Sequence, residues 1–156
     1  MSYFDAIEVG RTDELGCHRF EADEIVRFAR QFDPQPFHLD PEAASRSVFG
    51  ALCASGWHTV AVFMRLNVEH ADRETERCRA AGLPLPGFGP SPGVSDLRWL
   101  RPVFASETVA YRQTIVAKRA SASRPDWGLV STSVDAATGA GEPVLAMKAR
   151  VFVALG

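Results

Sequence analysis

The segment from Ser55 to Val68 is apolar nearly all round a helix for about two turns, and no other feature constrains the fold as strongly. A helix of this kind is buried on most sides, so the rest of the chain has to surround it. In 109–117 and 145–155 the apolar residues recur at every second position, which is typical of half-buried strands. A turn at 138–141 joins the second of these to a strand that begins near Trp127. An antiparallel sheet around a central helix buries both patterns, so the predicted fold class is α+β.

Length and composition indicate one globular domain over residues 1–156. The chain has 46% hydrophobic and 23% charged residues, which excludes a disordered tail and a coiled coil. Lys+Arg number 17 and Asp+Glu 19, a balance that does not favour nucleic acid or an anionic membrane surface as partner. The Gly- and Pro-rich segment 82–93 is interpreted as a long loop within the domain, because a boundary there leaves two halves that are too small.

The cysteines and the N-terminus predict a reduced, cytoplasmic protein. Cys17, Cys53 and Cys78 are far apart and form no CxxC pair or Cys/His cluster with zinc spacing, so we expect no metal. The first residues lack the basic region and apolar stretch of a signal peptide. The longest apolar stretch, Thr59–Met64, is too short to cross a bilayer, so no membrane partner is expected.

A helix is predicted from Asp23 to Phe32, since four apolar residues fall at positions i, i+3, i+4 and i+7. These residues are Ile25, Phe28, Ala29 and Phe32. Pro34 disfavours the helical conformation in the residue before it, so the helix is expected to end at Asp33. The segment from 33 to 41 contains three prolines and is expected to be rich in turns.

Asp33 and His38 are the first candidate site residues. They lie five residues apart in a segment stiffened by Pro34 and Pro36, whose fixed φ angles limit how the two side chains point. A carboxylate and an imidazole on one pocket wall can share a water molecule, the first accepting its proton and the second relaying another. That is the minimal apparatus for adding water to a double bond or removing it. The alternative stays open, since Asp-Pro also opens ordinary turns and a single loop histidine is usually a surface residue.

Ala54-Ser55-Gly56 opens the apolar helix and forms the second candidate group. The first N–H groups of a helix have no partner within the helix, and the helix dipole favours negative charge there. A glycine lets a ligand approach this backbone, so Gly56 N–H is a candidate donor to the oxygen of a thioester carbonyl. The alternative is that Gly56 only allows close packing at the helix start.

Together the two segments resemble the signature of the MaoC-like (R)-specific enoyl-CoA hydratases and dehydratases. In that family a helix with Phe-Ala leads to D-x-N-P-x-H, an alanine pair and a small-residue-Gly step into a helix. The corresponding residues here are Phe28-Ala29, Asp33, Pro36, His38, Ala43-Ala44 and Ser55-Gly56. Further along, Trp99–Phe104 is similar to the family's F-x-x-P-V strand entry. The resemblance covers most of the chain and implies a single hot-dog domain, in which an antiparallel sheet wraps around a central helix.

The resemblance also implies an activity. Asp33 and His38 would be the catalytic dyad that holds the water, and Gly56 with Ser55 would form the oxyanion and substrate-binding site. Water would add to a trans-2-enoyl-CoA to give a 3-hydroxyacyl-CoA. No metal or redox cofactor is implied; the partners are the acyl-CoA substrate and a second copy of the chain, as a homodimer.

Three positions depart from the family's pattern. Gln35 stands where the motif usually has Asn, and its extra methylene is expected to affect the loop that aims the dyad. Ser106-Glu107 replaces the usual Gly-Asp pair after the P-V strand entry. Met64 stands roughly where some members have a serine on the buried helix.

Several further residues have two interpretations each. Phe37 and Trp57 line either the acyl pocket or the core. His58, two residues after Gly56, either touches substrate or is an ordinary histidine on a helix face. Arg98 and Arg101 either meet the phosphates of CoA or are simply solvated.

Two other functions compete with the hydratase. A hot-dog thioesterase would use a carboxylate from the central helix, but there is no Asp or Glu between Gly56 and Val68. A non-catalytic acyl-thioester-binding subunit has no need of an Asp and a His together, so the pair Asp33 and His38 argues against this function.

Overall fold

The structure is a computed structural model and describes residues 1–156. The helices are α1 (Tyr3–Ala6), α2 (Ala22–Phe32), α3 (Pro36–Leu39), α4 (Pro41–Ser45) and α5 (Gly56–Ala80). The strands are β1 (Thr12–Arg19), β2 (Gly93–Trp99), β3 (Thr108–Ala120), β4 (Trp127–Thr138) and β5 (Pro143–Ala154). None of the helices combines the length and the hydropathy that a membrane span requires.

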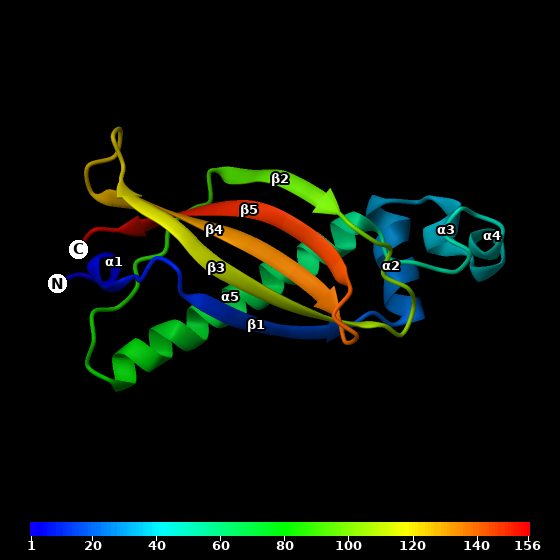
Figure 1. The fold of residues 1–156 in the computed structure, drawn as a ribbon, viewed down its shortest axis with the longest axis horizontal. Helices are drawn as coiled ribbons and strands as arrows, with labels where there is room; N and C mark the ends of the chain where they lie inside the picture. Colours follow the sequence, from blue (N-terminus) through cyan, green and yellow to red (C-terminus); the bar gives the residue numbers. More distant parts are fainter.

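The five strands form one antiparallel sheet in the order β1-β3-β4-β5-β2. Helix α5 runs along one face of this sheet (Figure 1). Helices α2, α3 and α4 gather at one end of the molecule, whereas α1 and both chain termini lie at the other (Figure 1). The predicted α+β class, with an antiparallel sheet wrapped around a central helix, is confirmed.

The main core fills the space between α5 and the sheet. Val62, Phe63 and Leu66 of α5 are buried in one cluster with residues of β3, β4 and β5. Tyr111 of β3 is fully buried, and its hydroxyl donates to the backbone oxygen of Thr59 at 2.9 Å. This hydrogen bond connects the sheet to α5 one turn after the helix begins, close to the candidate site.

Helix α5 extends well beyond the apolar segment that predicted it and ends at Ala80. Its second half is charged, and pairs three or four residues apart support it, such as Arg65–Glu69 at 2.9 Å and Arg77–Glu74 at 2.8 Å. The hydrogen bond from Arg77 is the main reason why the pKa of Glu74 is lowered to about 2. Apolar periodicity is absent from these turns, so it could not predict them.

The segment from 33 to 41, expected to be rich in turns, contains one short helix and the first residue of another. Pro36 and Pro41 each stand at the start of one, α3 and α4. Proline suits this position because its φ is already helical and the missing N–H would have no partner there. The predicted helix before this segment is confirmed as α2, with Asp33 as its C-cap.

The Gly- and Pro-rich segment 82–93 is a loop within the domain, as predicted, and part of it pairs with β5. Phe88 bridges Val153, and Gly89 N–H donates to the oxygen of Phe152 at 2.7 Å. The segment therefore continues the line of β2 along β5. Apolar alternation does not predict β1 or β2; β1 has one buried residue, and β2 is largely exposed.

We expect Leu66→Ala to lower the free energy of unfolding by about 2–5 kcal/mol, because it opens a cavity between α5 and the sheet. Leu66 is 4% exposed, and its Cδ2 lies close beside Gly16 of β1. Asp72→Ala, at an exposed position of the same helix, is the matched control and should change stability by less than about 0.5 kcal/mol. Urea denaturation at one protein concentration measures both variants, and equal stabilities would contradict this account of the core.

Candidate active site

Asp33 and His38 face each other at the junction of α2 and α3. Asp33 caps the C-terminus of α2, and His38 lies in the single turn of α3. The distance from His38 Nε2 to Asp33 Oδ2 is 3.4 Å, and both side chains are largely buried. The structure thus brings together the two residues that the sequence singled out.

The ring of His38 is oriented by the backbone of the segment before α5. Its Nδ1 lies 2.6 Å from the backbone oxygen of Cys53. A carbonyl oxygen only accepts, so Nδ1 carries the proton and donates. In the neutral imidazole, Nε2 therefore presents a lone pair toward Asp33. The thiol of Cys53 is not a competing nucleophile, because burial raises its pKa to about 11.

The carboxylate of Asp33 is held at both oxygens. Gln35 Nε2 donates to Oδ1 at 2.6 Å, and Ser55 Oγ donates to Oδ2 at 2.7 Å. Burial alone would raise the pKa of Asp33, but the hydrogen bonds from Ser55 and Gln35, with the nearby His38, outweigh it and lower the pKa below 3.8. Asp33 is therefore a fixed anion at neutral pH.

Two of these partners have roles that the sequence did not indicate. The longer side chain of Gln35 reaches back to hold Asp33, so this departure from the family's motif supports the carboxylate. Ser55, expected to bind substrate, is instead fully buried behind the cavity, where it bonds Asp33 and caps α5 by accepting from Trp57 N–H at 3.2 Å. No motif spacing signals either contact.

A cavity of about 470 Å³ opens beside the two residues. It is lined by Asp33, Gln35, Phe37, His38, Phe49, Cys53, Ala54, Gly56, Trp57, Thr59, Trp99, Leu100, Arg101, Pro102, Val103 and Val144. Nothing within the chain accepts from Gly56 N–H at the start of α5. A Cβ at this position would overlap the indole ring of Trp99, so the glycine is also needed for packing. Both interpretations of Gly56 thus have a structural basis.

Phe37 and Trp57 both contribute to the wall of this cavity. The ring of Phe37 meets His38 edge-on with ring centroids 4.6 Å apart. Trp57 is 55% exposed and lies edge-on to Trp99 at 5.0 Å. The aromatic rings give the cavity an apolar side next to the polar pair.

Arg101 also lines the cavity, but its charge is already paired. Its guanidinium lies 3.0 Å from Glu107 and 3.4 Å from Glu142. Glu107 additionally accepts from Phe104 N–H at 2.8 Å. The residue before it, Ser106, has φ 72°, a left-handed conformation that glycine, the family's usual residue here, adopts without strain.

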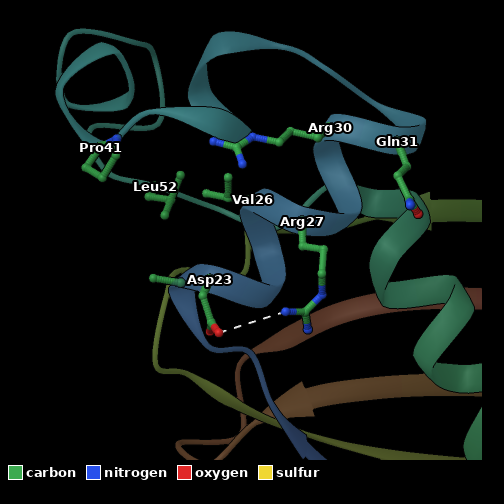
Figure 2. A pocket seen from close by; sticks show the side chains of 8 residues that line it. Asp23, Val26, Arg27, Arg30, Gln31, Pro41 and Leu52 are labelled. Atoms are coloured by element: carbon green, nitrogen blue, oxygen red, sulfur yellow. Dashed lines mark ion pairs between the residues drawn. The ribbon is translucent and has the colours of Figure 1, made fainter.

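A second cavity, of about 570 Å³, lies on the outer side of α2 and is shown in Figure 2. Arg27 turns toward Asp23 there, 4.0 Å away (Figure 2). The cavity contains no imidazole or thiol beside a carboxylate, so it offers no acid–base pair. Elsewhere, His18, Glu24 and His58 are the one group whose potential metal-ligand atoms lie within 4.8 Å of one another.

Comparison with known proteins places these residues in context. A family model described as "MaoC like domain" matches residues 8–137. The uncharacterized protein YdeM of Bacillus subtilis (strain 168) is 37% identical over 65 residues, and this match spans 42% of the chain and 46% of YdeM, less than half its length.

Two solved structures extend the similarity to the whole chain. The MaoC-like dehydratase from Rhodospirillum rubrum is 37% identical with a TM-score of 0.78, over 96% of this chain and 94% of that one. An (R)-hydratase from A. caviae is 24% identical with a TM-score of 0.67, over 94% and 96% of the two chains, and this likeness shows the hot-dog fold alone.

We expect Ser55→Ala to lower the free energy of unfolding by about 1–2 kcal/mol at about pH 7, because it removes a buried donor to Asp33 and the cap of α5. The pKa of Asp33 is lowered in the folded protein. The part of the stabilisation that depends on the ionised carboxylate is therefore fully present above pH 3.8, and it is lost as the pH falls through the lowered pKa of the folded protein. The difference between wild type and variant should therefore be constant from about pH 7 to about pH 5 and shrink as the pH falls below 3.8.

Urea denaturation across this range measures the effect. Ser45→Ala is the matched control, since the Ser45 hydroxyl donates to the backbone oxygen of Glu42 and to no charged group. Its effect should not vary with pH. A pH-independent loss in Ser55→Ala would leave the cap as the only contribution of Ser55.

Proposed function

The chain belongs to the MaoC-like domain family, and from this premise we propose that it is a hydro-lyase acting on an acyl-CoA thioester. The reaction is that of an (R)-specific enoyl-CoA hydratase or 3-hydroxyacyl-CoA dehydratase, in which water adds to C2=C3 or leaves. The similarity to the MaoC-like dehydratase from Rhodospirillum rubrum supports this reaction class.

The approach of His38 Nε2 to Asp33 Oδ2 carries the proposal. A water molecule beside this 3.4 Å gap is within reach of a lone pair on Nε2 and of the carboxylate. As its oxygen attacks C3, Nε2 takes its proton and then gives that proton to C2, so the hydroxyl ends on C3. The lowered pKa of Asp33 makes the carboxylate a weak base, which favours His38 as the base and Asp33 as the stabiliser of the imidazolium.

Negative charge develops on the thioester oxygen during the addition, and Gly56 N–H is the proposed donor to it. The amide lines the same cavity as Asp33 and His38 and stands at the N-terminus of the 25-residue helix α5. A preorganised N–H at a helix N-terminus stabilises developing negative charge through both its hydrogen bond and the helix dipole.

The acyl group of the substrate is proposed to lie against Phe37 and Trp57. Acid–base chemistry of this kind requires no metal and no redox cofactor, and we propose none. The thioesterase alternative is disfavoured because Asp33 is the one carboxylate that lines the cavity, and α5 contributes none. A binding subunit without catalysis is an outcome that the kinetic experiment below distinguishes.

We propose that two copies of the chain pair as a homodimer along β2 and α5. Trp57, Met64 and Val68 expose apolar surface on one side of α5, and Val94 and Leu100 do so at the edge strand β2. Strand β2 has a free edge, which is a ready template for another strand. A reducing cytoplasm, the proposed location, is consistent with the three free cysteines.

We expect purified protein to hydrate crotonyl-CoA, with Asp33→Asn and His38→Gln each lowering kcat by about 10² to 10⁴-fold. Both substitutions keep the size of the side chain, so circular dichroism should show an intact fold. Asp40→Asn is the matched control, because Asp40 caps α4 outside the cavity and Asn also caps helices well. Tight binding of crotonyl-CoA without turnover by the wild type would support the binding subunit instead.

We expect light scattering coupled to size-exclusion chromatography to give the mass of a dimer, and Val94→Lys to give a monomer. The new charge would lie on the β2 edge, where it discourages pairing of strands. Val116→Lys, at a similarly exposed valine of β3, is the control and should leave the dimer intact. A wild-type protein that elutes as a monomer would contradict the proposed pairing.

A further inference from the structure

Two histidines converge on one glutamate on the side of α5 away from the cavity. His18 lies at the end of β1, Glu24 in the first turn of α2 and His58 in the first turn of α5. Glu24 Oε1 is 2.8 Å from His18 Nε2 and 3.1 Å from His58 Nε2. We name these three residues the Glu24 clamp. None of the three lines the cavity that contains Asp33 and His38.

The neighbours of the clamp determine where the protons are. Arg65 NH2 lies 3.1 Å from His18 Nδ1, and a guanidinium only donates, so Nδ1 accepts and Nε2 carries the proton. His18 Nε2 therefore donates to Glu24. His58 Nε2 donates to the same oxygen, because its Nδ1 is buried and without a partner, whereas a protonated Nδ1 would be a buried donor without an acceptor. The clamp is thus one carboxylate that accepts from two neutral imidazoles.

Aromatic rings fix the position of His58 further. Its ring stacks on Phe28 of α2 with centroids 4.5 Å apart and planes 6° from parallel, and it meets Phe20 edge-on at 5.0 Å. His58 is 4% exposed, and this burial is the main reason why its pKa lies below 6.5. Helix α2 therefore contacts the first turn of α5 through both Glu24 and Phe28.

The same two helices carry the site residues. Helix α2 ends at Asp33, and Gly56 opens α5 two residues before His58. Ser55 and Asp33 join the helices beside the cavity at 2.7 Å, and the Glu24 clamp joins them again at the other end of α2. Two separate attachments restrain rotation of α2 against α5, whereas a single attachment would act as a pivot.

We propose that His18, Glu24 and His58 are positioning residues for the hydration reaction, an inference that rests on the proposed function. The Glu24 clamp holds α2 and α5 so that the water beside Asp33 and His38 faces C3 of an enoyl thioester whose carbonyl oxygen is bound at Gly56. A mutation far from the reacting atoms that displaces a catalytic group by about 1 Å lowers the rate by about 10²-fold.

A metal site is the alternative use of these three residues, since two imidazoles and a carboxylate suit divalent transition metals. The groups next to the two histidines argue against a metal site. A metal-bound imidazole carries its proton on the other nitrogen and donates it to an acceptor. At His18 that nitrogen faces the donor Arg65, and at His58 it faces no acceptor.

The test compares His58→Phe and Glu24→Gln with wild type in crotonyl-CoA hydration. His58→Phe keeps a ring to stack on Phe28 and loses the hydrogen bond. We expect both variants to lower kcat about 10-fold to 100-fold, with KM changed by less than about threefold. Arg30→Ala, at an exposed position of α2 whose charge does not act on His58, is the matched control and should leave kcat within about twofold.

A pH profile separates positioning from general loss of structure. The charged and titratable groups around His58 are Glu24 and Arg27 of α2, His18 of β1 and, through His18, Arg65 of α5. Protonation of His58 would bury an N–H without an acceptor, so the clamp opens as the pH falls below 6.5 through the lowered pKa. Acid also protonates the proposed base, His38, in both proteins, so the wild type should lose kcat more steeply on the acid side than His58→Phe does.

Each remaining outcome decides between the proposals. If wild type hydrates crotonyl-CoA and His58→Phe keeps its kcat and an equally steep acid-side loss, the positioning role is overturned and the proposed function stands. If wild type has no turnover, the proposed function fails and the clamp's role fails with it. Binding of one Zn²⁺ per chain that His58→Phe abolishes would overturn the clamp in favour of a metal site.

Discussion

The hydrogen bond from Ser55 to Asp33 is the interaction on which the rest of the site depends. One buried hydroxyl caps the long helix and, at the same time, holds the carboxylate that ends α2. Asp33 can therefore remain ionised in a largely buried position, and the helix start is fixed relative to it. His38 is oriented from the same stretch of chain, through the carbonyl of Cys53. The positions of Asp33 and His38 thus both depend on the residues just before α5.

Much of the fold could be predicted from the sequence, because its periodic patterns are local. The apolar spacing of α2 and the alternation in β3 and β5 predicted those elements, and the apolar first half of α5 predicted a central helix. Its charged second half, β1 and the mostly exposed β2 have no such pattern. Ion pairs along α5 and hydrogen bonds to strands distant in sequence stabilise them, and neither kind of contact is visible in a short window.

In the candidate site, too, the sequence predicts local features but not contacts between residues that are distant in sequence. Asp33 and His38 were predicted because stiff prolines separate them by a short, fixed distance, so their proximity is nearly a local property. The support of Asp33 by Ser55 joins residues 22 positions apart, and that of His38 by Cys53 joins residues 15 apart. The contact of Glu24 with His58 spans 34 positions. Such contacts depend on how α2 docks against α5, which composition and spacing do not determine.

The position of the Trp99 indole has a consequence for the proposed activity at low protein concentration. It stands at the end of edge strand β2, and its ring covers Gly56 closely enough to exclude any side chain there. In the proposed dimer, β2 would pair with the second copy, and this pairing would restrain the strand end that carries Trp99. Dilution that separates the two copies would remove this restraint on Trp99 and disturb the proposed thioester site at Gly56, while Asp33 and His38 stay in place. Specific activity would then fall on dilution and recover on concentration, as in an enzyme whose working unit is the pair.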